Sequence, residues 1–251
     1  MTLAASAWAL LAMQASVPAP PPGDPLFAEA ARAANEFTAR LPDFFCRQVL
    51  DRAVSPHRRV KWQHLDTITA EVAYEQGHEV RRSIVRAGKP VADIEELLDI
   101  GPWSQGEWGT VLANLFDPEV HATFFDAGPY ELKGSRGRKY RFAVLEAHSR
   151  WRIIHNETQI LPAYTGMVWI DSKSRRVVRI TKEARGLPED FALDVVEMSI
   201  DYGWASIQGN RYLLPVRSAS LVCHREQWRC SLNSTVFRDH RKFEAQSRIV
   251  P

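Results

Sequence analysis

Residues Tyr164–Ile180 have the pattern of a β-hairpin, and this pattern decides what kind of sheet the chain can build. Met167–Ile170 and Val177–Ile180 are rich in β-branched and aromatic residues, which favour strands. The polar segment Asp171–Arg176 separates them where a hairpin would reverse direction. Two strands this close in sequence pair with little loss of chain entropy. The sequence therefore predicts an antiparallel sheet that includes this hairpin.

Further strands are predicted on both sides of the hairpin. Before it, strand patterns cover Phe45–Val54, Leu65–Tyr74 and Val80–Arg86, with turn residues between them. Beyond Phe124, apolar residues alternate with polar ones, which predicts strands with one apolar face. The clearest alternating residues are Tyr140, Phe142 and Val144, and then Val196, Met198, Ile200 and Tyr202. Strands in succession with short connections predict an antiparallel meander, curved around its apolar face.

Two helices are predicted to cover that face. Asp24 and Pro25 form a typical helix start, and an apolar stripe follows from Phe27 to Leu41 and ends at Pro42. Ser104–Glu107 matches a capping box, which predicts the start of the second helix. That helix presents a bulky apolar face and ends at Asp117. The residues of this face are Trp108, Val111, Leu112 and Leu115.

The N-terminal residues have the features of an export signal. Leu3–Met13 is an apolar run of the right length for a signal-peptide core and too short to span a bilayer. Small residues follow, so we expect a signal peptide over residues 1–19 and one mature domain over 20–251. The chain begins Met-Thr-Leu without the usual basic residue, which indicates an upstream start or a lost basic region. The alternative is an N-terminal helix packed in the fold. No later segment predicts a transmembrane helix, so a periplasmic or secreted location is expected.

Composition excludes several classes of protein. Hydrophobic residues make up 45% and charged residues 25%, which are ordinary values for a globular domain. Lysine and arginine total 32 against 30 acidic residues, a net charge of +2. A dedicated nucleic-acid binder needs a larger basic excess to neutralise phosphates. No nucleic-acid partner is therefore expected.

The cysteines favour a disulfide over a metal site. Cys223 and Cys230 flank a short predicted loop, where two adjacent strands would bring them together, and disulfides are common in exported proteins. Cys46 is then left unpaired, although it is also able to compete for either of the other two cysteines. Zinc binding by Cys223, His224 and Cys230 is the alternative, but a fourth ligand at a recognisable spacing is missing. No metal is expected.

No catalytic motif is present in the sequence. It contains no H-E-x-x-H, no G-x-S-x-G and no phosphate-binding glycine loop. His78 with Glu79, and His155 with Glu157, place imidazole near carboxylate, but such neighbours are more often surface pairs than an acid and base couple. The sequence therefore predicts a protein that is not an enzyme and carries no cofactor.

The motifs of the hairpin resemble those of the periplasmic lipoprotein-carrier and lipoprotein-sorting (LolA-like) superfamily. The resemblance rests on Gly166–Asp171, Arg176–Ile180 and Tyr212–Pro215, which are similar to a G-x-(apolar)-W-(apolar)-D hairpin and a later Y-L-P turn. It implies an α+β fold of mostly antiparallel β structure, in which a curved open half-barrel sheet is covered by short helices. It also implies an apolar concavity, which holds acyl chains in carriers and serves signalling in sensor relatives. Fold carries over from such a resemblance better than function.

The candidate ligand-binding residues belong to this concavity and its cover. The cover candidates are Trp108, Val111, Leu112 and Leu115, and the concave-face candidates are Phe142, Trp169, Met198 and Tyr202. Val168 and Ile170 make both faces of the Trp169 strand apolar, so the face of Trp169 is ambiguous. The leading hypothesis is an exported binding module for a lipid acyl chain or a lipidated partner. The alternative is a structural or sensory domain with a filled core that contacts another envelope protein. An enzyme of unrecognised type is the third hypothesis.

Overall fold

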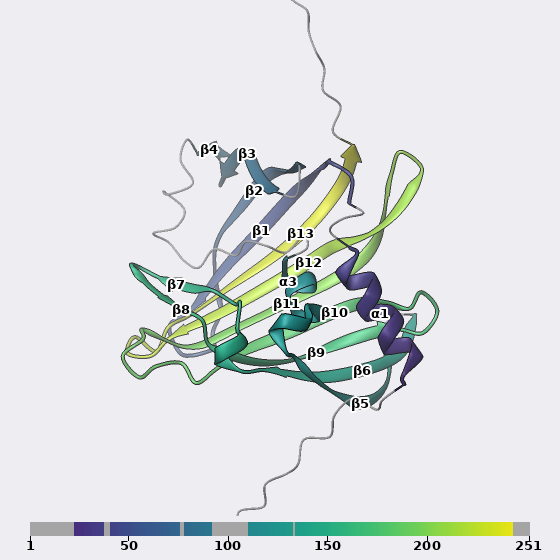
Figure 1. Cartoon of the computed structure of the whole chain (residues 1–251). Helices are drawn as coiled ribbons and strands as arrows, with labels where there is room; N and C mark the ends of the chain where they lie inside the picture. The colour runs from purple at the N-terminus through teal and green to yellow at the C-terminus, as the bar shows by residue number, and fades with distance from the viewer. Residues whose placement is uncertain (1–22, 38–40, 76–77, 92–109, 133, 243–251) are drawn as a thin grey trace, which may run out of the picture.

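The structure is a computed structural model that describes residues 23–37, 41–75, 78–91, 110–132 and 134–242 (Figure 1). In this part of the chain, eleven strands form one antiparallel sheet, and two further strands, β7 and β8, form a separate small ribbon. The sheet strands are β1 (Phe44–Ser55), β2 (Gln63–Glu75), β3 (His78–Arg86), β4 (Lys89–Pro90), β5 (Thr123–Leu132), β6 (Ser135–Val144), β9 (Ala163–Asp171), β10 (Arg176–Arg185), β11 (Leu193–Ile207), β12 (Asn210–His224) and β13 (Cys230–Lys242). The ribbon strands are β7 (Ile153–His155) and β8 (Thr158–Ile160), and the helical elements are α1 (Pro25–Asn35), α3 (Thr110–Phe116), and the 3₁₀ turns η2 (Pro118–Val120) and η3 (Glu146–His148).

The sheet consists of two meanders, one from β1 to β4 and one from β5 to β13, which are joined by the pairing of β1 with β13. Its order is β4-β3-β2-β1-β13-β12-β11-β10-β9-β6-β5. β1 pairs with β13 over almost its whole length, for example Leu50 opposite Thr235. The expected single meander in chain order is therefore wrong at this point. Pairing of β1 with β13 is a contact between distant parts of the chain, and no local pattern in either strand specifies it.

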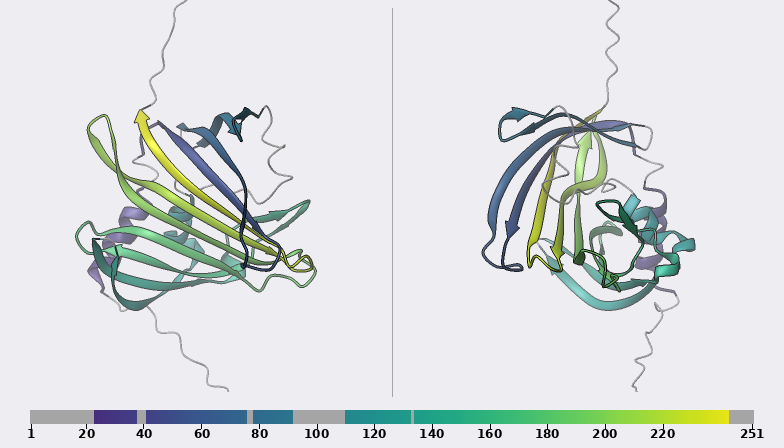
Figure 2. Two further views of the ribbon diagram at one scale, coloured as in Figure 1. Left: turned by 180° about the vertical axis from the view of Figure 1, so that it is seen from behind. Right: turned by 90° about the vertical axis from the view of Figure 1, so that its left-hand side faces the viewer.

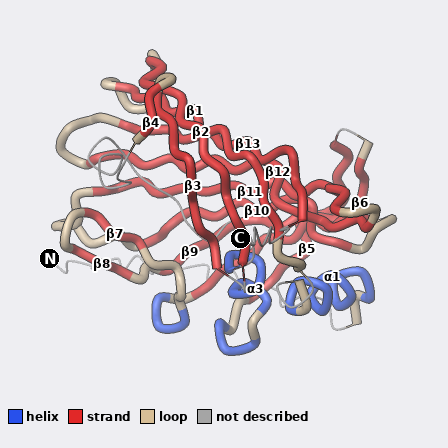
Figure 3. The backbone as a smooth tube through the Cα atoms, turned by 90° about the horizontal axis from the view of Figure 1, so that it is seen from above, coloured by secondary structure: helices blue, strands red, loops and turns tan. Residues whose placement is uncertain are grey.

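The sheet is open and strongly curved, and the helices lie on its concave side (Figure 2). Seen from above, α1 and α3 lie together on one side of the strands (Figure 3). A large antiparallel sheet twists and coils in this way when one of its faces is covered. The predicted fold class, an open half-barrel of antiparallel strands with short helices over it, is confirmed.

The predicted hairpin is formed by β9 and β10. Val168 lies opposite Ile180, and both side chains are buried. Asp171 organises the turn, because its carboxylate accepts hydrogen bonds from the backbone amide of Ser174 at 2.7 Å and from Ser135 Oγ at 2.9 Å. These bonds to the charged form act against the desolvation that would raise the pKa of Asp171, and the net effect is a lowered pKa.

One of the two predicted helices differs from the sequence expectation at its C-terminal end. Asp24 caps α1 as expected, but the helix ends at Asn35 rather than near Leu41. Asparagine is a weak helix former that favours helix ends. Phe37 nevertheless still packs against the sheet side chains. α3 ends at Phe116 as predicted, whereas its predicted start at Ser104–Glu107 lies outside the described residues.

The predicted disulfide is confirmed. Cys223 and Cys230 are opposite each other at the end of the β12–β13 hairpin and are bonded. Closing this short loop stabilises the fold by roughly 2 kcal/mol through the unfolded state. Cys46 is a free thiol on β1 and is almost completely buried. Burial raises the pKa of the Cys46 thiol, so it behaves as a small apolar side chain.

The predicted export signal lies outside the residues that the structure describes. Residues 1–19, the predicted signal peptide, precede the first described residue. Among the described residues, neither α-helix has the length and hydropathy that crossing a membrane requires.

Candidate functional site

Apolar side chains from nine elements, η2 among them, form one cluster on the concave face, which we call the apolar cluster. It combines the inner sides of α1 and α3 with one face of β5, β6, β9, β10, β11 and the start of β12. Its buried members are Ala30, Ala34, Leu112, Leu115, Phe116, Val120, Phe124, Tyr140, Phe142, Val144, Tyr164, Val168, Ile170, Val177, Ile180, Met198, Ile200, Tyr202 and Leu213. The alternation read from the sequence therefore assigns the inner face of these strands correctly.

Most of the predicted ligand-binding residues meet in the apolar cluster. Phe142, Met198 and Tyr202 belong to its sheet side, and Leu112 and Leu115 belong to its helix side. The structure brings these five together, but their role in binding stays a prediction. Val111 is partly buried and packs against the same cluster. Trp108 lies outside the described residues.

Trp169 lies on the opposite face of the sheet, so its expected place in the concavity is wrong. Its neighbours Val168 and Ile170 are fully buried in the apolar cluster. Successive side chains of a strand point to opposite faces, which turns Trp169 outward. There, the guanidinium carbon of Arg179 lies 5.6 Å from the centre of the indole ring. A cation over an aromatic face stabilises this outer position.

Helix α1 is fastened to the sheet by a polar contact and by aromatic packing. One carboxylate oxygen of Asp24 accepts hydrogen bonds from the amides of Leu26 and Phe27, and the other accepts one from Tyr140 Oη at 2.5 Å. Burial, and the hydrogen bond to Asp24, raise the pKa of Tyr140. The Phe27 ring centre lies 4.8 Å from that of Phe124 and 5.1 Å from that of Tyr140. The start of α1 is therefore attached to the sheet both by the hydrogen bond from Tyr140 to Asp24 and by the packing of Phe27.

Helix α3 is held on the sheet by apolar side chains. Seven of its residues, Thr110–Phe116, are described, and a helical segment of this length is not stable in water without tertiary contacts. Its contacts come from Leu112, Leu115 and Phe116, which are all buried in the apolar cluster. The stability of α3 therefore depends on the packing of these three side chains on the apolar cluster.

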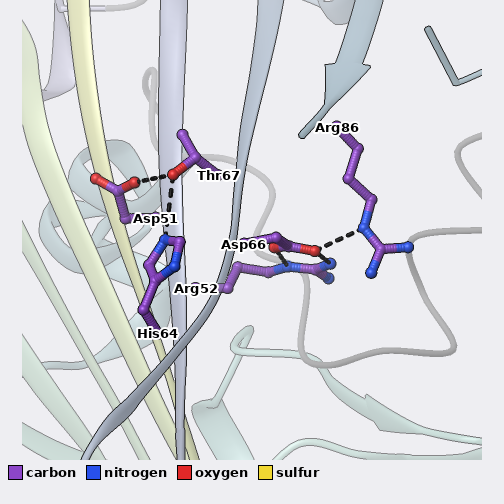
Figure 4. Close-up of polar contacts among 6 residues, drawn as sticks. All are labelled: Asp51, Arg52, His64, Asp66, Thr67 and Arg86. Atoms are coloured by element: carbon purple, nitrogen blue, oxygen red, sulfur yellow. Dashed lines mark hydrogen bonds and ion pairs between the residues drawn. The ribbon is translucent and has the colours of Figure 1, made fainter. Parts of the chain in front are cut away.

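The concave face also carries a charged cluster that the sequence analysis missed, formed by Arg52, Asp66 and Arg86 (Figure 4). Arg52 donates from Nε and Nη2 to the two oxygens of Asp66, both at 2.7 Å. Arg86 donates from Nε to Asp66 Oδ2 at 2.6 Å. The hydrogen bonds from Arg52, together with the one from Arg86, lower the pKa of the Asp66 carboxyl against the opposing effect of burial.

The alternation of β1 and β2 contained the signal for this charged cluster. Arg52 is in phase with the buried Phe44, Cys46 and Leu50 of the same strand. Asp66 is in phase with the buried Ile68. A charged residue at an apolar phase of a strand is unusual, because burial of a charge requires a partner. Two such residues on predicted neighbouring strands would have indicated a buried ion pair.

Two clefts are lined mainly by residues outside the apolar cluster, with Met198 belonging to both the second cleft and the cluster. One, of about 510 Å³, lies between the β5–β6 hairpin and the β9–β10 turn, next to Tyr130 and Arg136. The other, of about 830 Å³, lies along the middle strands and includes Met167, Leu221 and Met198 in its lining. The described residues contain no group of three or more histidine, cysteine, aspartate or glutamate side chains arranged to hold a metal ion.

No protein-family model matches the chain, and no curated protein matches it. Among solved structures, it is similar to a LolA superfamily protein from Nitrosomonas europaea, with 9% identity, a TM-score of 0.36, and coverage of 90% of this chain and 96% of the other. It is also similar to a domain named as an outer membrane lipoprotein-sorting protein from Vibrio parahaemolyticus, with 9% identity, a TM-score of 0.40, and coverage of 88% and 93%. A DUF1329 family protein from Desulfovibrio piger matches with 11% identity, a TM-score of 0.41, and coverage of 90% and 96%. The first two carry names from the superfamily that the sequence motifs resemble.

Proposed function

We propose that this protein is an exported binding protein that accommodates an acyl chain, from a lipid or a lipidated partner, on the concave face of its sheet. The observation that carries the proposal is the apolar cluster itself. Its sheet side spans β5, β6 and β9–β11, and in the described residues short helices cover it where a β-sandwich would have a second sheet. An apolar sheet face covered by short helices is suited to exchanging part of that cover for an apolar ligand.

The energies of burial favour such an exchange. Uncovering Leu112, Leu115 and Phe116 costs about 1.5 to 3 kcal/mol for each side chain. An acyl chain of about 16 carbons gains roughly 0.8 kcal/mol per buried methylene, on the order of 10 kcal/mol in total. The gain from the ligand therefore exceeds the cost of moving α3 by roughly 1 to 5 kcal/mol, before the entropy lost on binding is subtracted.

The disulfide supports an extracytoplasmic location. Cys223 and Cys230 are bonded, and such bonds form and persist in oxidising compartments such as the bacterial periplasm. This agrees with the export signal expected from Leu3–Met13. Periplasmic export belongs to the proposal, as does the absence of catalysis.

A second candidate function is a structural or sensory domain that acts by contact with another envelope protein. The observation that favours it is how completely the described side chains already fill the apolar cluster. Tyr140, Val168 and Ile170 are 0% exposed without any ligand, and Phe27 packs on Phe116 and Phe124 above them. In this candidate, α3 is a permanent part of the core and no ligand enters.

Titration with a fluorescent fatty acid, 11-(dansylamino)undecanoic acid, separates the two candidates. We expect saturable binding by the wild-type protein. Leu115→Ala should bind about tenfold more tightly or better, because the substitution weakens the packing that closes α3 and so raises the fraction of binding-competent protein. Far-ultraviolet circular dichroism checks that the variant is folded.

Leu132→Ala is the matched control, because Leu132 lies on β5, is 48% exposed and is not a member of the apolar cluster. It should bind like the wild type. Absence of saturable binding in both the wild type and Leu115→Ala would exclude the acyl-chain proposal and leave the second candidate. Weaker binding by Leu115→Ala would show that α3 is a wall of the site and is not displaced.

A further inference from the structure

The concave face changes from apolar to polar across the sheet, and the strand register shows where. One row of paired, inward-facing residues runs from β10 to β2 through Lys182, Met198, Ser220, Asn233, Arg52 and Asp66. The next row runs from β11 to β3 through Ile200, Ser218, Thr235, Leu50, Ile68 and Arg86. Both rows begin beside the apolar cluster, cross hydroxyl or amide side chains on β12 and β13, and end at the charged cluster.

The middle of this path is polar and buried. Ser218, Asn233 and Thr235 are each less than a tenth exposed. Ser220 Oγ is inaccessible to solvent, and no hydrogen-bond partner for it is present in the described part of the chain. A buried hydroxyl without a partner is unfavourable, and a bound molecule with oxygen atoms would satisfy it. The strip between the apolar and charged clusters is thus suited to polar atoms of a ligand.

The charged end has an excess of cations. On β1, β2 and β3, the inward-facing charged residues of the described strands are three arginines and two carboxylates, namely Arg52, Arg81, Arg86, Asp66 and Glu79. Arg81 and Glu79 lie 3.6 Å apart and balance each other. Asp66 is shared by two arginines, Arg52 and Arg86.

Arg86 is the arginine best placed to meet a ligand. Arg52 is only 2% exposed and uses two nitrogens on Asp66, whereas the Arg86 side chain is 34% exposed. Within the described residues, Arg86 bonds to Asp66 through Nε alone, which leaves its two terminal nitrogens for another acceptor. A guanidinium edge of this kind binds a phosphate or carboxylate through two parallel hydrogen bonds.

We propose that the charged cluster binds the anionic headgroup of an amphiphile whose acyl chain lies on the apolar cluster. This inference rests on the proposed function and narrows its ligand to an acidic lipid or a similar single-chain anion. From β11 to β2 the path crosses four inter-strand spacings of about 4.8 Å, or about 19 Å in all, so an extended single-chain amphiphile is long enough to reach from the charged cluster to the apolar cluster. Arg86 then selects for the negative charge, and the polar side chains of β13 and β12 lie between the headgroup and the apolar cluster.

The test measures how well three competitors displace the fluorescent fatty acid. They are palmitoyl lysophosphatidylglycerol and uncharged monopalmitoylglycerol, both below their micelle-forming concentrations, and inorganic phosphate. The wild type should bind the anionic lipid at least about tenfold more tightly than the uncharged one, which corresponds to one charge-assisted interaction of about 1.4 kcal/mol. In Arg86→Gln this preference should fall to about twofold or less, while Arg86→Lys should keep part of it.

Arg82→Gln is the matched control on the same strand. Arg82 faces outward, where its guanidinium donates to Glu75 at 2.9 Å, and the substitution should keep the full preference. The proposal of a headgroup site would be overturned if the wild type bound both lipids equally, or if Arg86→Gln kept the full preference for the anionic lipid. Either result would leave the acyl-chain proposal intact. No binding of either lipid would instead overturn the proposed function. Displacement by inorganic phosphate but by neither lipid would show that the site binds free anions, and would overturn the proposal that its ligand is an amphiphile.

Discussion

Asp66→Asn is expected to lower the free energy of unfolding by about 3 to 5 kcal/mol, measured by urea denaturation at pH 7. The substitution leaves Arg52, which is 2% exposed, without the carboxylate that binds two of its nitrogens. A buried charge without its partner is far more unfavourable than the intact pair. Because a domain is typically stable by only 5 to 15 kcal/mol, this loss should be visible as a large fall in the denaturation midpoint.

The dependence of this loss on pH has a definite sign. The hydrogen bonds from Arg52 lower the pKa of Asp66, so the stabilisation is present above the ordinary aspartate pKa of 3.8 and disappears as the pH falls through the lower value of the folded state. The difference between wild type and Asp66→Asn should therefore shrink below about pH 4. Glu75→Gln removes the carboxylate of the exposed Arg82 pair and should lose less than about 1 kcal/mol. Equal losses in the two variants would show that Asp66 is not in a buried pair.

Gly166→Ala is expected to destabilise the protein by about 3 kcal/mol or more, because a Cβ atom has no room at this position. It would lie 2.0 Å from the Thr181 carbonyl oxygen and 2.4 Å from Phe142 Cζ. The glycine lets the Phe142 ring lie over β9 in the apolar cluster, and the backbone of β10 limits any adjustment. Thermal unfolding followed by circular dichroism measures the effect.

Gly203→Ala is the control for the glycine prediction, because the first contact of its Cβ is with Val216 Cγ1 at 2.9 Å. A side chain adjusts more easily than a backbone carbonyl, so this variant should lose about 1 kcal/mol. If Gly166→Ala is no less stable than Gly203→Ala, the close packing of Phe142 over β9 is wrong. Reduced solubility of Gly166→Ala, with a lowered unfolding temperature, agrees with the prediction.

Local patterns predicted the elements of the sheet well because strands that pair across a short loop leave a recognisable pattern in the sequence. The β9–β10 hairpin, the alternation of β6 and β11, and the Cys223–Cys230 bond all join residues separated by short loops. For these elements, turn chemistry and a period of two are sufficient. The Asp24 cap of α1 is local in the same sense.

Features that depend on distant contacts were not predictable in this way. The pairing of β1 with β13 depends on two strands at opposite ends of the described chain. The face of Trp169 was ambiguous because its whole strand is apolar, and only packing of Val168 and Ile170 in the cluster decides it. Arg52 and Asp66 stand at apolar phases of β1 and β2, which is a local signal, but only the register of the two strands shows that they are partners. The charged cluster was missed because this signal was not used.

The lipid-binding proposal is tested most directly by native mass spectrometry of the full-length protein, purified without detergent from the envelope of a Gram-negative cell that expresses it. The proposal predicts a population heavier than the polypeptide by the mass of one lipid, which collisional activation releases as an ion of that mass. An acidic lipid in this population would agree with the positive charge at Arg86. A spectrum that shows only the bare polypeptide, under conditions where a known lipid-binding protein from the same cells keeps its ligand, would contradict the account.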